Sequence, residues 1–110
     1  MNINDVNWAD ATLRGFSLNR ANLEIAVDLW DERQAMVIAE DCVSTVFAAY
    51  DGSIDTVAEG PLSDRELAHL VAIEELPASF RALSIKDQDS RTILHVVARG
   101  FQVDLRKSVA

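Results

Sequence analysis

The side chains best suited to acid–base or metal chemistry in this 110-residue chain are two histidines and one cysteine. Histidine is the side-chain type that most often serves as an acid–base group or a metal ligand, and His69 and His95 could with Cys42 supply three zinc ligands. No two of them stand at a local ligand interval such as C-x-x-C or H-x-x-x-H. We therefore expect no metal centre and interpret all three side chains as structural.

The sequence also lacks a linear motif for a catalytic nucleophile or for phosphate binding. No serine lies in G-x-S-x-G or S-x-x-K, and the four glycines are too dispersed to form a phosphate-binding loop. The run Asp51-Gly52-Ser53 departs from a calcium loop, because its glycine comes second where that loop needs it sixth. The sequence therefore predicts a protein that is not an enzyme and that carries no cofactor.

Charge is distributed unevenly along the chain. Residues 1–80 carry fifteen acidic side chains against four arginines, and residues 81–110 carry six basic side chains against three aspartates, for a net charge of −8. A field of this sign repels phosphate, so a nucleic-acid partner is not expected. The skew instead favours self-association or the binding of a basic protein partner, such as a toxin or nuclease, by an acidic antidote.

Trp30 is the first candidate for a contact with such a partner, because tryptophan is enriched at the buried centre of interfaces. The alternative, that a helix packs over Trp30, stays open. Acidic residues near it in the sequence would steer a basic partner. These residues are Asp28, Asp31, Glu32, Glu40 and Asp41.

The cysteine count and the N-terminal residues indicate in which cellular compartment the protein is expected. A single cysteine allows no intramolecular disulfide, and Met1-Asn2-Ile3-Asn4-Asp5 lacks the features of a signal peptide. No run approaches the roughly 18 apolar residues that span a bilayer. We expect a cytoplasmic protein with a single domain over residues 1–110. In size, acidity and strand pattern it resembles small acidic bacterial domains, including immunity-protein-like ones.

Strand patterns dominate the first half of the chain. Residues 23–29 alternate aliphatic and polar side chains, which predicts a strand with one buried face. Residues 11–18 read as a strand with a β-bulge at Gly15, and short polar links on either side of residues 23–29 predict hairpins. Met36 to Ile38 is continuously apolar and reads as a covered strand.

Residues 43–50 fit both helical spacing and a β-rich composition. The dipeptide Asp51-Gly52 that follows is a strong hairpin signal. We therefore expect residues 43–50 and 53–58 to pair as strands, with the helical alternative open.

One helix is predicted. Ser63 and Glu66 have the spacing of a capping box, so the helix should begin near residue 64, and Pro77 should end it near Leu76. Beyond it, residues 83–86 and 91–99 should form a hairpin. Gly100 is either a bulge within one long strand or the start of a separate final strand, and we favour the bulge, because a two-residue turn would force Arg99 to positive φ.

The predicted fold is α+β: a mainly antiparallel meander sheet of six to eight strands, with one helix after the fifth strand and closure into a barrel left open. The first functional hypothesis is a non-catalytic interaction protein. The alternative is a small-molecule binding module, with a ligand held between the helix and the sheet near His69, His95 or Tyr50.

Overall fold

The computed structural model describes residues 2–48, 52–73 and 79–107. Its elements in chain order are the 3₁₀ helix η1 (Ile3–Asp5), β1 (Ala11–Asn19), β2 (Asn22–Asp28), β3 (Arg33–Glu40), β4 (Ser44–Phe47), β5 (Ser53–Ile54), β6 (Thr56–Gly60), α1 (Asp64–Ala72), β7 (Arg81–Lys86), β8 (Thr92–Ala98) and β9 (Gly100–Lys107).

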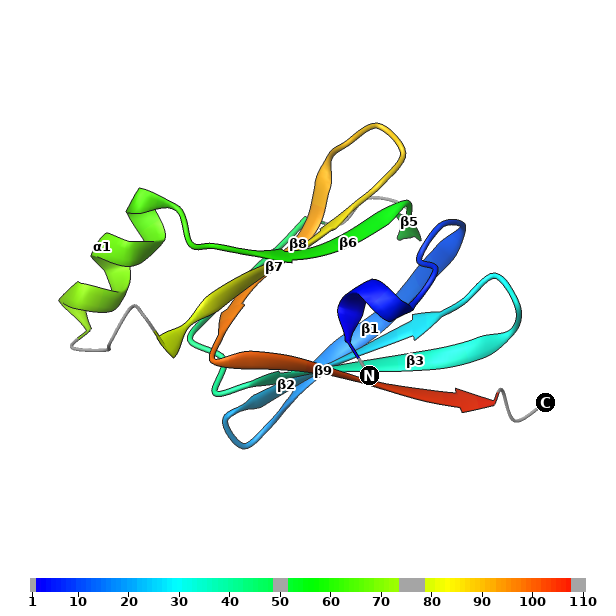
Figure 1. The fold of residues 1–110 in the computed structure, drawn as a ribbon, viewed down its shortest axis with the longest axis horizontal. Coiled ribbons are helices and arrows are strands. Elements are labelled where there is room, and N and C mark those ends of the chain that lie inside the picture. Colours follow the sequence, from blue (N-terminus) through cyan, green and yellow to red (C-terminus); the bar gives the residue numbers. More distant parts are fainter. Residues whose placement is uncertain (1, 49–51, 74–78, 108–110) are drawn as a thin grey trace.

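These strands form two antiparallel sheets (Figure 1). The five-stranded sheet has the order β5-β1-β2-β3-β9, and the four-stranded sheet has the order β4-β8-β7-β6. The chain passes between the sheets through short links, such as Asp55 between β5 and β6 and Arg99 between β8 and β9. The curvature is that of a half-barrel, and α1 lies at one end of the molecule.

The predicted N-terminal meander is confirmed. β2 pairs with β1 on one side and with β3 on the other, and the register shift between Leu13 and Gly15 is the expected bulge. Leu23, Ile25 and Val27 are buried, as their alternation predicts.

Aliphatic residues from both sheets make up most of the main core, which also includes Ile3, Val6 and Trp8 from the segment before β1, so neither sheet has a separate interior. A smaller cluster of Leu70, Phe80 and Val97 anchors α1 on the four-stranded sheet.

The predicted hairpin at Asp51-Gly52 is wrong. Residues 44–47 do form a strand, but β4 pairs with β8, and the expected strand 53–58 is divided between the two sheets. Both Ile54 and Val57 are buried. Because side chains alternate along a strand, residues three apart cannot face one side of a single regular strand, and the break falls at Asp55. Residues 49–51 lie outside the described residues.

The interpretation of Gly100 as a bulge is also wrong. β8 belongs to the four-stranded sheet and β9 to the other one, where it pairs with β3. The backbone N–H of Arg99 donates to the Glu40 carbonyl at the crossing (2.8 Å). The described residues therefore hold nine strands rather than six to eight, and the helix follows the sixth strand rather than the fifth.

The start of α1 agrees with its prediction. The Ser63 hydroxyl accepts from the Glu66 backbone N–H, and the Glu66 carboxylate accepts from the Ser63 backbone N–H, which is the expected capping box. α1 ends at Ala72; the predicted end near Leu76 lies outside the described residues. No helix in the described ranges is long and apolar enough to cross a membrane.

Asp87 gives the fold a testable pH dependence. Its nearly buried carboxylate, in the β7–β8 loop, accepts from the backbone N–H groups of Asp89 (3.0 Å) and Arg91 (2.9 Å) and from Arg91 Nε (2.8 Å). Burial alone would raise the pKa of Asp87, but the hydrogen bonds and charge of Arg91 hold it below its ordinary value of 3.8.

Because the folded-state pKa is lowered, this stabilisation is present above the unfolded-state pKa and is lost as pH falls through the folded-state value. We expect Asp87→Asn to lower the melting temperature at pH 7 and to reduce the loss of stability on acidification, measured by circular dichroism. The control is Asp104→Asn, whose partner Arg106 and own carboxylate are both largely exposed. Equal pH profiles for wild type and Asp87→Asn would contradict this role.

Candidate functional site

A pocket of about 500 Å³ lies between α1 and the four-stranded sheet. We call it the α1–β8 pocket. Most of the surface that lines it is apolar. Its lining residues are Ser44, Val46, Ser63, Arg65, Glu66, His69, Leu70, His95 and Val97.

Helical spacing and sheet register together build the pocket. Glu66, His69 and Leu70 stand at i, i+3 and i+4 in α1, so they share one face of the helix. On the sheet, Ser44 lies opposite Val97 and Val46 lies opposite His95, which places two cross-strand pairs on the pocket floor.

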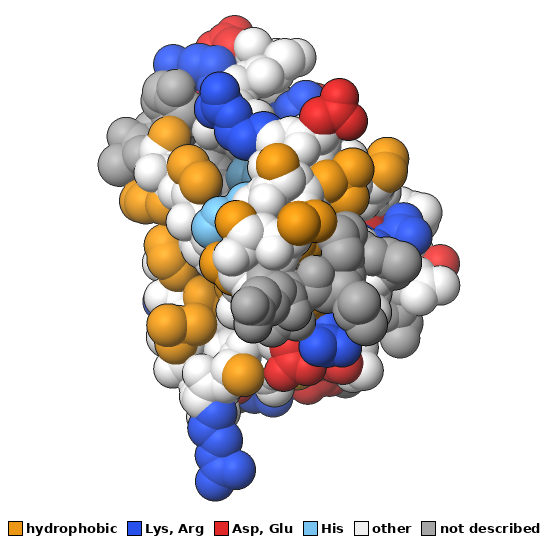
Figure 2. Space-filling model, turned by 90° about the vertical axis from the view of Figure 1, so that its left-hand side faces the viewer, with side chains coloured by type: hydrophobic (Ala, Val, Ile, Leu, Met, Phe, Trp, Pro, Cys, Tyr) orange, Lys and Arg blue, Asp and Glu red, His pale blue; other side chains and the backbone are white. Residues whose placement is uncertain are grey.

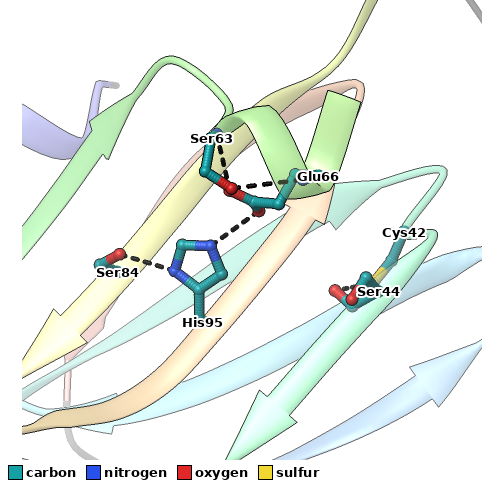
Figure 3. Close-up of polar contacts among 6 residues, drawn as sticks. All are labelled: Cys42, Ser44, Ser63, Glu66, Ser84 and His95. Atoms are coloured by element: carbon teal, nitrogen blue, oxygen red, sulfur yellow. Dashed lines mark hydrogen bonds and ion pairs between the residues drawn. The ribbon is translucent and has the colours of Figure 1, made fainter. Parts of the chain in front are cut away.

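A chain of hydrogen bonds joins α1 to two strands at the edge of this pocket (Figure 3). His95 Nε2 lies 2.8 Å from Glu66 Oε2, and His95 Nδ1 lies 2.8 Å from Ser84 Oγ. Ser84 and His95 are direct cross-strand neighbours on β7 and β8. We call this arrangement the Glu66–His95–Ser84 chain.

The charge of Glu66 determines which atoms donate and which accept the hydrogen bonds of this chain. Burial alone would raise the pKa of Glu66, but hydrogen bonds from the Ser63 backbone N–H and from His95 outweigh that effect and lower the pKa. Glu66 is therefore ionised at neutral pH and can only accept hydrogen bonds. In a neutral His95, Nε2 then carries the proton and Nδ1 accepts from the Ser84 hydroxyl.

A second cavity, of about 270 Å³, opens on the other flank of His95. We call it the β6 cavity, because most of its wall comes from β6 and the residues after it. Its lining residues are Thr56, Ala58, Glu59, Gly60, Pro61, Ala82, Ser84, Lys86 and His95. His95 therefore borders both hollows, whereas Ser84 lines only this one.

Hydrophobic side chains gather around the histidines on the face of the molecule that carries α1 (Figure 2). Val46, Phe47, Leu67 and Val71 are all exposed. Phe47 makes an edge-to-face contact with Phe16 of β1, with ring centroids 5.1 Å apart. Exposed apolar groups in such number beside a pocket are typical of a binding surface.

The predicted partner-contact residues do not form one surface. Asp28, Trp30, Asp31 and Glu32 lie at the β2–β3 turn, whereas Glu40 and Asp41 lie at the other end of β3. An eight-residue strand separates the two groups by about 25 Å.

Trp30 is 60% exposed, so no element of the described chain covers it. Most of the acidic candidates already have partners within the protein. Asp28 pairs with Arg14 (3.2 Å), Asp31 with Arg33 (2.7 Å) and Asp41 with Arg99 (3.2 Å), and Glu40 accepts a hydrogen bond from Gln102.

Two members of the site were not recognised from the sequence. The sequence predicts Glu66 only as a helix cap, and Ser84 lies in no nucleophile motif. One sequence feature did indicate that Ser84 lies near His95. It is the predicted hairpin of residues 83–86 and 91–99, because that pairing places Ser84 beside His95. His69 and His95 both line the pocket, whereas Tyr50 lies outside the described residues.

Within the described ranges, no three histidine, cysteine or carboxylate side chains come together in a way that could hold an ion. Cys42 Sγ instead contacts the Thr45 hydroxyl (3.2 Å). Comparison of the chain with protein-family models, with curated proteins and with solved structures finds no match.

Proposed function

We propose that this protein is a small-molecule binding module whose ligand occupies the α1–β8 pocket. The observation that carries the proposal is the pocket itself: about 500 Å³ of mostly apolar wall, with a few polar groups converging at one side. Ligand sites are typically concave and apolar, have volumes of about 300 to 1,000 Å³, and use a few polar groups to orient the ligand.

The lining predicts the type of ligand. Val46, Leu70 and Val97 offer an apolar surface for the body of the molecule. His69 and Arg65, one helical turn apart on α1, can donate hydrogen bonds to a polar end. The best match is a compact molecule with an apolar body and a single polar group.

The experiment is a thermal-shift screen against small aliphatic and aromatic acids, amines, alcohols and amides. A compound that binds only the folded protein stabilises it by about 2.7 kcal/mol at 100 times its Kd. We expect a subset of compounds with an apolar body to raise the melting temperature.

A matched pair of variants locates the binding. Val46→Arg should abolish the ligand-induced shift, because it places a charged side chain in the pocket wall. Val71→Arg is the control, since Val71 is as exposed as Val46 (64% and 63%) but does not line the pocket. Loss of the shift in both variants, or in neither, would contradict binding at this pocket.

A second candidate function, the binding of a protein partner, is favoured by the exposure of Trp30. An uncovered tryptophan at a turn that also carries Asp28, Asp31 and Glu32 fits a contact with a basic protein or a second copy. Because Asp28 and Asp31 are paired with arginines, electrostatic steering by this turn would be weaker than the sequence predicts.

Trp30→Ala tests this second candidate. We expect the variant to lose most of its capture of a lysate partner, since a tryptophan hot spot contributes at least about 2 kcal/mol. Capture should also fall with rising salt. Sedimentation of the purified chain separates self-association from a foreign partner. Unchanged capture by Trp30→Ala would exclude Trp30 as a contact.

A further inference from the structure

We propose that Ser84 is a nucleophile that accepts acyl groups from small esters, with His95 as its general base and Glu66 as the residue that positions the imidazole. The inference rests on the Glu66–His95–Ser84 chain and on the β6 cavity, into which Ser84 opens. It goes beyond ligand binding in the α1–β8 pocket and does not depend on it, because Ser84 lies on the other flank of His95.

The order of the three groups is that of an acid–base–nucleophile triad. Glu66 accepts from Nε2–H, which leaves the lone pair of Nδ1 directed at the Ser84 hydroxyl at 2.8 Å. In the familiar serine hydrolases the two ring nitrogens have the opposite roles. Both nitrogens of an imidazole can donate or accept a proton, so the exchange preserves the direction of proton transfer.

The β6 cavity would give a small ester access to Ser84 and His95. Its volume of about 270 Å³ suits a short acyl group, and Ser84, His95 and Lys86 all border it. The His95 side chain is 30% exposed, so its ring can exchange a proton with a leaving group in the cavity. Lys86, two residues along β7 from Ser84, lies on the same face of the strand and places a positive charge beside the site.

The proposed reaction is balanced without any further reactant except water. Ser84 Oγ attacks the ester carbonyl and its proton passes to His95 Nδ1; the C–O bond to the alcohol breaks, and the alcohol leaves with that proton. Water then adds to the acyl-enzyme and gives a proton to His95. The bond to Oγ breaks, the carboxylic acid leaves, and the proton returns to Ser84.

A purely structural chain would fasten α1 to the sheet without changing the reactivity of Ser84. The two roles are therefore separated by a reagent that reports activation of a serine. A fluorophosphonate forms a bond from phosphorus to Oγ, expels fluoride and reacts only slowly with an ordinary hydroxyl. We expect it to label Ser84 in the full chain, as mapped by peptide mass spectrometry.

Variants test each role. Ser84→Ala should remove the label, and His95→Gln should slow labelling by at least about 100-fold, the lower range for a general base. Glu66→Gln keeps the capping box, since glutamine also serves at that position. It should slow labelling and change its pH profile, which a helix tether alone would not do. The control variants are Ser17→Ala on β1 and Asp104→Asn on β9, two exposed residues that line neither the α1–β8 pocket nor the β6 cavity.

We expect Ser84 to be the one labelled serine, and we expect both control variants to be labelled at the wild-type rate. Labelling of Ser84 no faster than that of the exposed Ser63 in wild-type protein would overturn the proposal without requiring any variant to fold. Labelling of Ser84 that survives His95→Gln at the wild-type rate would also overturn it. Neither result bears on ligand binding in the α1–β8 pocket, which the thermal-shift screen measures separately.

Discussion

Leu70→Ala is expected to lower the free energy of unfolding by about 2 to 5 kcal/mol, the range for truncating a buried leucine. Leu70 is fully buried and packs with Phe80 and Val97 in the cluster beneath α1. It is also the one buried residue of this helix. Its truncation removes the main apolar contact that holds α1 on the sheet. Because Leu70 also lines the α1–β8 pocket, ligand-induced shifts should disappear with it.

The measurement is urea unfolding followed by circular dichroism and by tryptophan fluorescence. Val71→Ala is the control in the adjacent position: Val71 is mostly exposed, so its truncation should change stability by no more than about 0.5 kcal/mol. Equal losses in the two variants would show that burial of Leu70 does not hold α1 in place. A loss confined to the circular dichroism signal would indicate local release of the helix.

The second large effect is expected at the contact between Glu66 and His95. The two side chains are 19% and 30% exposed, and their atoms lie 2.8 Å apart, so the hydrogen bond is only partly screened by water. A double-mutant cycle with Glu66→Gln and His95→Leu should give a coupling free energy on the order of 1 to 2 kcal/mol.

Glu66→Gln suits this cycle because it removes the charge while keeping a capping-box residue in place. The control cycle pairs Glu59→Gln with Arg81→Gln, an ion pair at 2.7 Å whose arginine is about half exposed, for which we expect less than about 1 kcal/mol. A coupling near zero between Glu66 and His95 would contradict a connection between α1 and β8 through these side chains.

Local patterns predicted those elements whose structure is set by near neighbours in the sequence. The alternation in residues 23–29 indicates which face of β2 is buried, and the Ser63 and Glu66 capping box marks the start of α1. The bulge at Gly15 follows from the phase change between Leu13 and Phe16. In each case the deciding contacts lie within a hairpin or one helical turn.

The division of the strands between two sheets was not predictable in this way. Asp55 and Arg99, the residues at two of the crossings, are neither glycine nor proline, and neither belongs to a turn dipeptide such as Asn-Gly or Asp-Gly. What decides each crossing is pairing with a distant strand: β5 with β1, and β9 with β3. The three-residue spacing between the apolar residues Ile54 and Val57 is the sequence feature that indicates a break between β5 and β6.

The candidate site shows the same limit. A pocket between helix and sheet near His69 and His95 was anticipated, because both elements had been recognised. The Glu66–His95–Ser84 chain was not, because its members come from a helix and two strands and are separated by 18 and 11 residues in the sequence. Motif searches address only residues at fixed local spacing.

The decisive measurement uses the fact that the chain has two histidines, both of which line the α1–β8 pocket. Protein labelled with ¹³C in the histidine rings gives two sets of ring signals, which can be followed while the strongest compound from the thermal-shift screen is added. We predict that both sets move and saturate together, and that Val46→Arg prevents the change while Val71→Arg does not. Saturable binding that leaves both sets in place would show that the ligand site lies elsewhere on the protein.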